Sequence, residues 1–113
     1  MANHKLERIE SDILKYLSNI LLTETRDEFI KTVTLTDVEL NKDLSLAKIY
    51  FTSFSEISHK DCEKEMNEAS PFLRGKLAKV LEIRNIPELR FIYDETIEYA
   101  TKIERIINNI SKN

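Results

Sequence analysis

Apolar residues near the N-terminus recur at steps of three and four, which is the spacing of one face of an α-helix. Polar residues fill most of the positions between them, so only one side of this helix is expected to face a core. The pattern predicts an amphipathic helix over residues 4–23. The apolar stripe consists of Leu6, Ile9, Ile13, Leu17 and Ile20.

The pattern then changes to a two-residue period, which is typical of strands. Residues 29–40 are rich in threonine and valine, and their alternation shifts by one residue near Asp37, which predicts a bulge. Residues 41–43 supply turn-forming side chains, and residues 46–54 alternate again. Two short strands joined by a tight turn predict an antiparallel hairpin. The inward face of the second strand is expected to consist of Ala47, Ile49 and Phe51.

Helical spacing returns over residues 59–83, although Pro71 lies in the middle of this segment. Proline removes a backbone donor and interrupts a helix, yet the apolar stripe stays in phase on both sides of it. We therefore expect a kink between two helical segments that share a buried face, with Ser70 capping the second and Pro71 at its first position. The stripe consists of Cys62, Met66, Ala69, Leu73, Leu77 and Val80.

Residues 84–87 break the helical pattern, and residues 88–93 form a short run rich in apolar and aromatic side chains, which predicts a third strand. Asp94 can cap a last helix. The element order predicts a single α+β domain over residues 1–113, with residues 95–113 as a C-terminal helical extension. The apolar positions of that extension are Ile97, Ala100, Ile103, Ile107 and Ile110.

Length and composition agree with one globular domain. The chain has 113 residues, of which 42% are hydrophobic and 33% are charged. It has one cysteine, no apolar segment near the N-terminus of the kind found in signal peptides, and no run of eighteen apolar residues. We therefore expect a cytoplasmic protein that does not enter a membrane.

The sequence offers no constellation typical of an enzyme or of a cofactor site. His59 and Cys62 are three residues apart, but His4 is the only other histidine and a closed zinc site needs four ligands. Gly75 is the only glycine, whereas phosphate-binding loops need several. We expect Cys62 in the core, no cofactor and no catalysis, and a small hydrolase is disfavoured because no nucleophile–base pair is evident. The aromatic residues that could stack on bases, most of them expected in the core, are Phe29, Tyr50, Phe51, Phe54, Phe72, Phe91 and Tyr93.

Basic residues are concentrated in one segment. The chain has a net charge of −3, but residues 74–90 carry five basic and two acidic side chains, so this segment is +3 and the remainder is −6. On a helical wheel, Lys79 points away from the apolar stripe, and Arg74 and Lys76 flank it. This pattern is compatible with a nucleic-acid-binding surface, and equally with an ordinary solvated helix face.

Three stretches of the chain resemble the ribosome-binding factor A family. They are RIESDILKYL (8–17), VTLTDVELNKDLSLAKIYFT (33–52) and ASPFLRGKLAKVLEIRNIPELRFIYDETIEYATKIE (69–104). The resemblance implies a KH-like fold of the α-β-β-α-α-β order (type II), in which a kink between two helices replaces the GXXG loop of KH domains. Family members often carry glycine at this kink, where the present sequence has Pro71.

The resemblance also implies a function in ribosome biogenesis. It predicts binding to the free or immature 30S subunit and its 16S rRNA near the decoding centre, and help with late small-subunit maturation and 16S rRNA processing. The alternative is a protein-interaction module that docks on ribosomal proteins or an assembly GTPase with little RNA contact. We expect a monomer. The predicted RNA-binding residues are Arg8, Arg74, Lys76, Lys79, Arg84 and Arg90.

Overall fold

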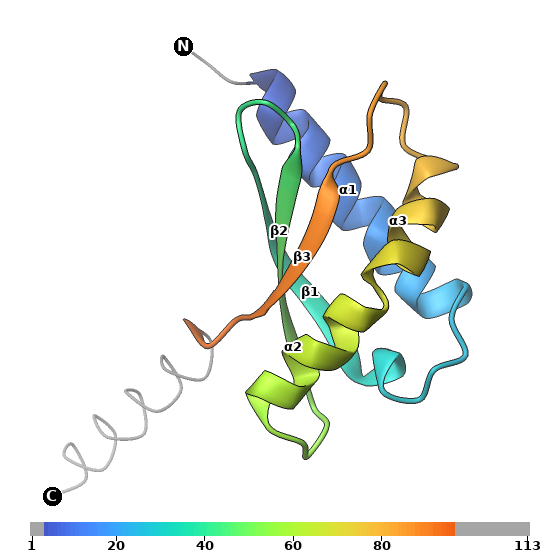
Figure 1. Ribbon diagram of the computed structural model, residues 1–113, viewed down its shortest axis with the longest axis vertical. Coiled ribbons are helices and arrows are strands. Elements are labelled where there is room, and N and C mark those ends of the chain that lie inside the picture. Colours follow the sequence, from blue (N-terminus) through green and yellow to red (C-terminus); the bar gives the residue numbers. More distant parts are fainter. Residues whose placement is uncertain (1–3, 97–113) are drawn as a thin grey trace, which may run out of the picture.

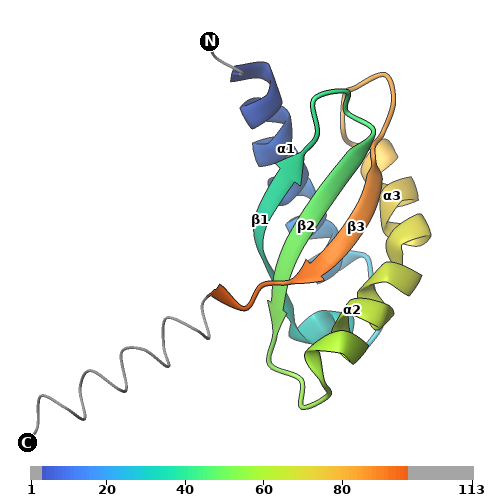
Figure 2. The ribbon, with the colours of Figure 1, turned by 60° about the vertical axis from the view of Figure 1, so that its left-hand side comes forward.

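The computed structural model describes residues 4–96. The helices in this range cover one face of a three-stranded sheet and leave the other face open (Figures 1 and 2). This α+β architecture is the predicted KH-like fold, with two consecutive helices where a GXXG loop would lie. In chain order the elements are α1 (His4–Thr23), η1 (Ile30–Thr32), β1 (Val33–Leu40), β2 (Leu46–Ser53), α2 (His59–Glu68), α3 (Ser70–Ala78) and β3 (Glu88–Tyr93).

The sheet has the order β1-β2-β3. β1 and β2 form the predicted antiparallel hairpin, and α2 and α3 provide the crossover that makes β3 parallel to β2. The predicted bulge is present, because the register shifts between Leu35 and Asp37. The Thr36 hydroxyl donates a hydrogen bond of 2.6 Å to the carboxylate of Asp94, which holds the pKa of Asp94 below its usual value.

The first strand begins later than predicted, at Val33 instead of residue 29. Residues 30–32 form the 3-10 helix η1, because the Asp27 carboxylate accepts hydrogen bonds from the backbone N–H groups of Phe29 and Ile30 and starts a turn. The second strand ends at Ser53, one residue earlier than predicted.

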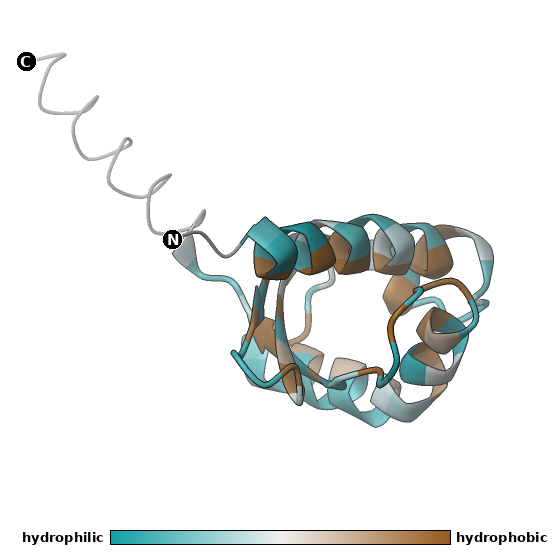
Figure 3. Ribbon diagram, turned by 90° about the horizontal axis from the view of Figure 1, so that it is seen from above, coloured by the Kyte–Doolittle hydropathy of each residue, from teal (hydrophilic) through white to brown (hydrophobic). Residues whose placement is uncertain are grey.

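The buried side chains form one core between the helices and the sheet, and Figure 3 shows the apolar side of α1 turned inwards. Cys62 lies in this core as predicted, with 1% of its surface exposed. Val80 was predicted to be buried but is 44% exposed, whereas Leu81, predicted on the same buried side, is buried. The reason is that α3 ends at Ala78, five residues before the predicted end, so the helical phase no longer applies. The largest fully buried side chains include Ile13, Leu17, Ile49, Phe51, Leu73, Leu77 and Phe91.

The predicted kink is present at Ala69, which separates α2 from α3. Two details of the prediction are wrong. Ser70 is the first residue of α3 and does not cap it, because the N-cap is Ala69, and Pro71 is therefore the second residue. Both positions tolerate proline, because the first turn of a helix has no intrahelical acceptor for its N–H groups.

The predicted C-terminal extension, residues 95–113, lies outside the described residues apart from Glu95 and Thr96. The Thr96 N–H donates a hydrogen bond of 2.9 Å to the Asp94 carboxylate. Across residues 4–96, none of the helices is both long enough and apolar enough to cross a membrane.

Candidate nucleic-acid interface

A stripe of polar side chains on α2 and α3 faces the free edge of β3. Its members recur at steps of four, three and four residues, so the stripe keeps its phase through the kink, as the apolar stripe beside it does. We call it the β3-facing stripe; it consists of Glu63, Asn67, Ser70 and Arg74.

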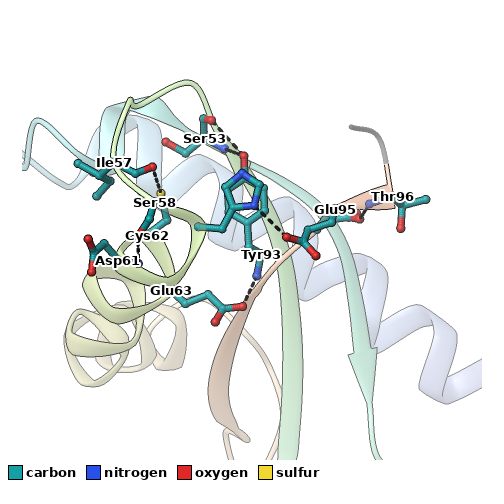
Figure 4. A network of polar contacts seen from close by, with 11 residues as sticks. Ser53, Ile57, Ser58, Asp61, Cys62, Glu63, Tyr93, Glu95 and Thr96 are labelled. Carbon is teal, nitrogen blue, oxygen red and sulfur yellow. Dashed lines mark hydrogen bonds and ion pairs between the residues drawn. The ribbon is translucent and has the colours of Figure 1, made fainter. Parts of the chain in front are cut away.

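The first half of the stripe binds the backbone of β3 itself. The Asn67 amide donates to the Phe91 carbonyl at 3.0 Å and accepts from the Phe91 N–H at 2.8 Å. The Glu63 carboxylate accepts from the Tyr93 N–H at 2.8 Å, a contact visible in Figure 4. These bonds satisfy backbone groups that β3 leaves unpaired because it lies at the edge of the sheet.

The second half of the stripe continues the same pattern toward the start of β3. The Ser70 hydroxyl donates to the Leu89 carbonyl at 2.7 Å. The Arg74 guanidinium donates to the Ile86 carbonyl at 2.7 Å, in the loop before β3. The kink thus lets one polar stripe follow a strand from end to end, and the cation of Arg74 takes part in holding the fold.

The N-terminal end of α2 carries the two side chains that could have suggested a metal. The His59 ring stacks on Tyr93 with centroids 3.7 Å apart, and its Nδ1 lies 3.0 Å from a Glu95 carboxylate oxygen. Burial raises the pKa of the Cys62 thiol, which is the opposite of what a thiolate nucleophile requires. No group of three metal-ligating side chains occurs within residues 4–96.

Another side of α3 points away from β3 and is open to solvent. At 100° per residue, its members span an arc of about 100°, centred roughly opposite Arg74. They include the C-cap Lys79, whose backbone angles are still helical (φ −79°, ψ −19°). Phe72 is 50% exposed, and the Lys76 ammonium lies 5.5 Å from the centroid of its ring. Lys79 is exposed, and no carboxylate in the described chain lies within ion-pair distance of it. We call this the outer face of α3; it consists of Phe72, Gly75, Lys76 and Lys79.

The structure divides the six predicted RNA-binding residues among several places around α3. Lys76 and Lys79 lie on the outer face, whereas Arg74 lines a groove beside β3 together with Arg90. Glu88 also lines this groove, so its positive charge is partly offset.

The two remaining predicted residues lie near the N-terminal part of α1. Arg8 lines a depression between α1 and residues 80–83, which Asp12 and Glu82 also line. Arg84 lines a neighbouring depression with Lys5. Because Val80 borders the Arg8 depression and directly follows Lys79, this surface adjoins the outer face of α3.

Two features of this region were not found by inspection of the sequence. Phe72 was grouped with aromatic residues expected mostly in the core, although its position one residue off the apolar stripe indicates exposure. The β3-facing stripe has a regular spacing in the sequence, but a polar stripe on a helix normally indicates solvent. Only the position of β3 reveals its role.

Comparison with known proteins decides the family. The sequence model of "Ribosome-binding factor A" matches residues 5–107, which is most of the chain. The chain belongs to the ribosome-binding factor A family. Ribosome-binding factor A of Streptococcus mutans is 36% identical over 114 aligned residues, which cover 99% of this chain and 98% of the relative.

Solved structures of the family share the fold. A solution structure of a proposed ribosome-binding factor A from Thermotoga maritima superimposes with a TM-score of 0.70 at 32% identity, covering 87% of this chain and 94% of that one. A homology model of the Thermus thermophilus ribosome-binding factor A, fitted into a cryo-EM map of a 30S–RbfA complex, gives a TM-score of 0.64 at 23% identity. This alignment covers 77% and 92% of the two chains.

Proposed function

We propose that this chain binds the small ribosomal subunit as an assembly factor. The observation that carries the proposal is its membership of a family in which the Thermus thermophilus relative has been fitted into a map of its complex with the 30S subunit. On this proposal the chain acts in the cytoplasm as a monomer, binds the free or immature 30S subunit, and assists late maturation and 16S rRNA processing.

The contact with 16S rRNA is assigned to the cations that the fold leaves available. Lys76 and Lys79 lie on the outer face of α3, and Arg8 lies on the adjoining surface. Phosphate contacts from such side chains supply most of the affinity of proteins for nucleic acid, while the shape of the RNA selects the site. Arg74 contributes less directly, because its guanidinium is held by the Ile86 carbonyl.

The proposed activity is binding without catalysis. Cys62 is the natural candidate for a nucleophile, but it is buried, and burial raises the pKa of its thiol. The His59 ring stacks on Tyr93, and its Nδ1 faces a carboxylate oxygen of Glu95 at 3.0 Å. These surroundings fit structural roles for both side chains.

Sedimentation with separated subunits and with intact ribosomes tests the proposal. The protein should pellet with isolated or immature small subunits and little with intact ribosomes. The double variant Lys76→Glu, Lys79→Glu should weaken this binding, and the slope of log affinity against log salt should flatten by roughly 0.7–0.9 for each phosphate that the variant no longer neutralises. Equal binding to both particles, or preference for the large subunit, would overturn the assignment.

The matched control is Lys60→Glu, Lys64→Glu, which makes the same change of charge on exposed positions of α2. If both double variants lose the same affinity, the net charge of the chain matters and the assigned surface is wrong. Both variants should retain the thermal stability of the parent, since these lysines lie outside the core.

A second candidate function is docking on a ribosomal protein or an assembly GTPase. It is favoured by an apolar depression between the end of α1 and the start of β1, lined by Leu21, Leu22, Val33 and Leu35. Leu22 is 83% exposed. An apolar interface of this kind should weaken little as salt rises, whereas RNA docking should weaken steeply.

A further inference from the structure

Gly75 is the only glycine of the chain, and nothing within the described fold requires a glycine there. It lies inside α3, and no glycine of the described chain has a positive φ. Apart from its chain neighbours and the backbone of its own helix, a Cβ built on Gly75 meets no atom within 4 Å. Glycine inside a helix is less stable than alanine, because it loses more conformational freedom on folding. A glycine that is costly and internally unnecessary is explained if a molecule outside the chain must approach the helix backbone at this point.

The surroundings of Gly75 indicate the chemistry of that molecule. Phe72, one turn earlier, exposes half of its surface, so an exposed aromatic side chain and the glycine lie on the same side of α3. The ammonium of Lys76 lies over the same ring at 5.5 Å from its centroid, and Lys79 follows one turn later. An exposed aromatic ring followed along the helix by two cations complements a ligand that carries a flat ring with negative charges next to it.

We propose that Phe72 and Gly75 form a stacking site for one unpaired RNA base, and that Lys76 and Lys79 bind the phosphates beside it. The proposal rests on the proposed function and makes it more specific. A base within an A-form duplex already has both faces stacked, so only an unpaired base can present a free face to Phe72. Stacking on an aromatic side chain tolerates any base, and nearby cations bind its backbone.

The first test separates stability from binding at Gly75. Gly75→Ala should raise the melting temperature by about 3 °C, because alanine favours the helix and meets no obstacle. The same variant should bind isolated small subunits several-fold more weakly, because the new methyl group holds the base away from the helix. A rise in melting temperature with unchanged binding would overturn the proposal.

The second test uses fluorescence, since the chain contains no tryptophan. Phe72→Trp introduces one reporter on the outer face of α3, and Phe54→Trp is the matched control at another exposed phenylalanine, 80% exposed, in the loop after β2. A single-stranded uridine 12-mer should quench the Phe72→Trp signal strongly and the Phe54→Trp signal little. An RNA duplex of the same length should quench neither.

Absence of quenching at position 72, or equal quenching by the duplex, contradicts a stacking site. Phe72→Leu retains apolar bulk without a stacking ring, and should bind isolated small subunits about 10-fold more weakly. If Phe72→Leu weakens binding to small subunits while the 12-mer fails to quench Phe72→Trp, a protein occupies this face and the base-stacking proposal is wrong. If the parent chain does not bind small subunits at all, the proposed function itself fails, which is a separate result.

Discussion

Basic side chains on two sides of α3 have different roles. Arg74, on the β3-facing stripe, donates a hydrogen bond to the backbone carbonyl of Ile86. Lys76 and Lys79, on the outer face of α3, direct their charges to solvent and, in the case of Lys76, to the ring of Phe72. Counting positive charges therefore does not by itself locate a binding surface, because a cation can also hold the fold, as Arg74 does with one of its five N–H donors.

Removing a hydrogen-bond donor from the β3-facing stripe should have the largest effect on stability. Asn67→Asp keeps the size of the side chain but sets a carboxylate against the Phe91 carbonyl, and should lower the free energy of unfolding by about 2 kcal/mol at neutral pH. Urea denaturation measures the loss. Lys79→Gln, the control on the outer face of α3, should change stability by less than about 0.5 kcal/mol.

The pH dependence of the stability of Asn67→Asp tests whether the lost hydrogen bond is the cause. Below about pH 4 the introduced carboxyl is protonated and can again donate to the Phe91 carbonyl. Protonation therefore favours the folded state of the variant, so the stability difference from the parent should shrink as the pH falls from 7 to 4. A difference independent of pH would mean that the lost hydrogen bond is not its cause.

Ser70→Ala should cost about 1 kcal/mol, because the Leu89 carbonyl loses a part-buried donor. Had Ser70 acted as a helix cap instead, Ser70→Asp would largely rescue stability, since aspartate caps as well as serine. Loss in both variants, measured by thermal denaturation, supports the bond to β3, and rescue by aspartate contradicts it.

Arg74→Gln and Lys76→Gln each remove one positive charge, from the β3-facing stripe and from the outer face of α3. Their effects on stability and on small-subunit binding can therefore be compared directly. Arg74→Gln should lower stability by roughly 0.5–1 kcal/mol, because an exposed hydrogen bond is lost, and should affect small-subunit binding little beyond this. Lys76→Gln should weaken binding and lower stability by at most about 0.5 kcal/mol, because only its contact with the exposed Phe72 ring is lost. Urea titration measures the stability of both variants, and sedimentation measures their binding to small subunits. If the two variants behave alike in both assays, the two sides of α3 do not have different roles.

Glu63→Gln is expected to have the smallest effect, below about 0.5 kcal/mol. The Tyr93 N–H needs only an acceptor oxygen, which glutamine also provides. Glu63→Ala should cost about 1 kcal/mol by comparison. If Glu63→Gln destabilises as much as Glu63→Ala, the charge of Glu63 has a role that the hydrogen bond to Tyr93 does not explain.

The sequence was sufficient to predict those helices and strands in which one side is buried and the apolar residues therefore recur regularly. The spacing of Ile9, Ile13 and Leu17 predicted the limits of α1, and the shift of alternation near Asp37 predicted the bulge. Pro71 was correctly associated with a kink, since an apolar stripe keeps its phase only when both helices pack on one core.

The misplaced details depend on contacts between segments far apart in the chain. Ser70 looked like a cap because capping is the local role of serine before a helix, yet its partner is Leu89 in β3. The bond of Arg74 could not be foreseen either, because Ile86 is twelve residues away and offers only its backbone, and RNA binding by Arg74 stays a prediction. Side-chain type does not encode such backbone partners, so the division of α3 into two sides required the structure.

The hydrogen bonds from α2 to β3 also have a consequence for amide hydrogen exchange. The Phe91 and Tyr93 N–H groups are protected by the side chains of Asn67 and Glu63, whereas amides directed toward β2 are protected by the sheet. If the kinked helix pair lifts away while the sheet stays intact, these two amides exchange early and their neighbours in β3 do not. Two backbone positions thus distinguish opening of the helix layer from unfolding of the whole domain.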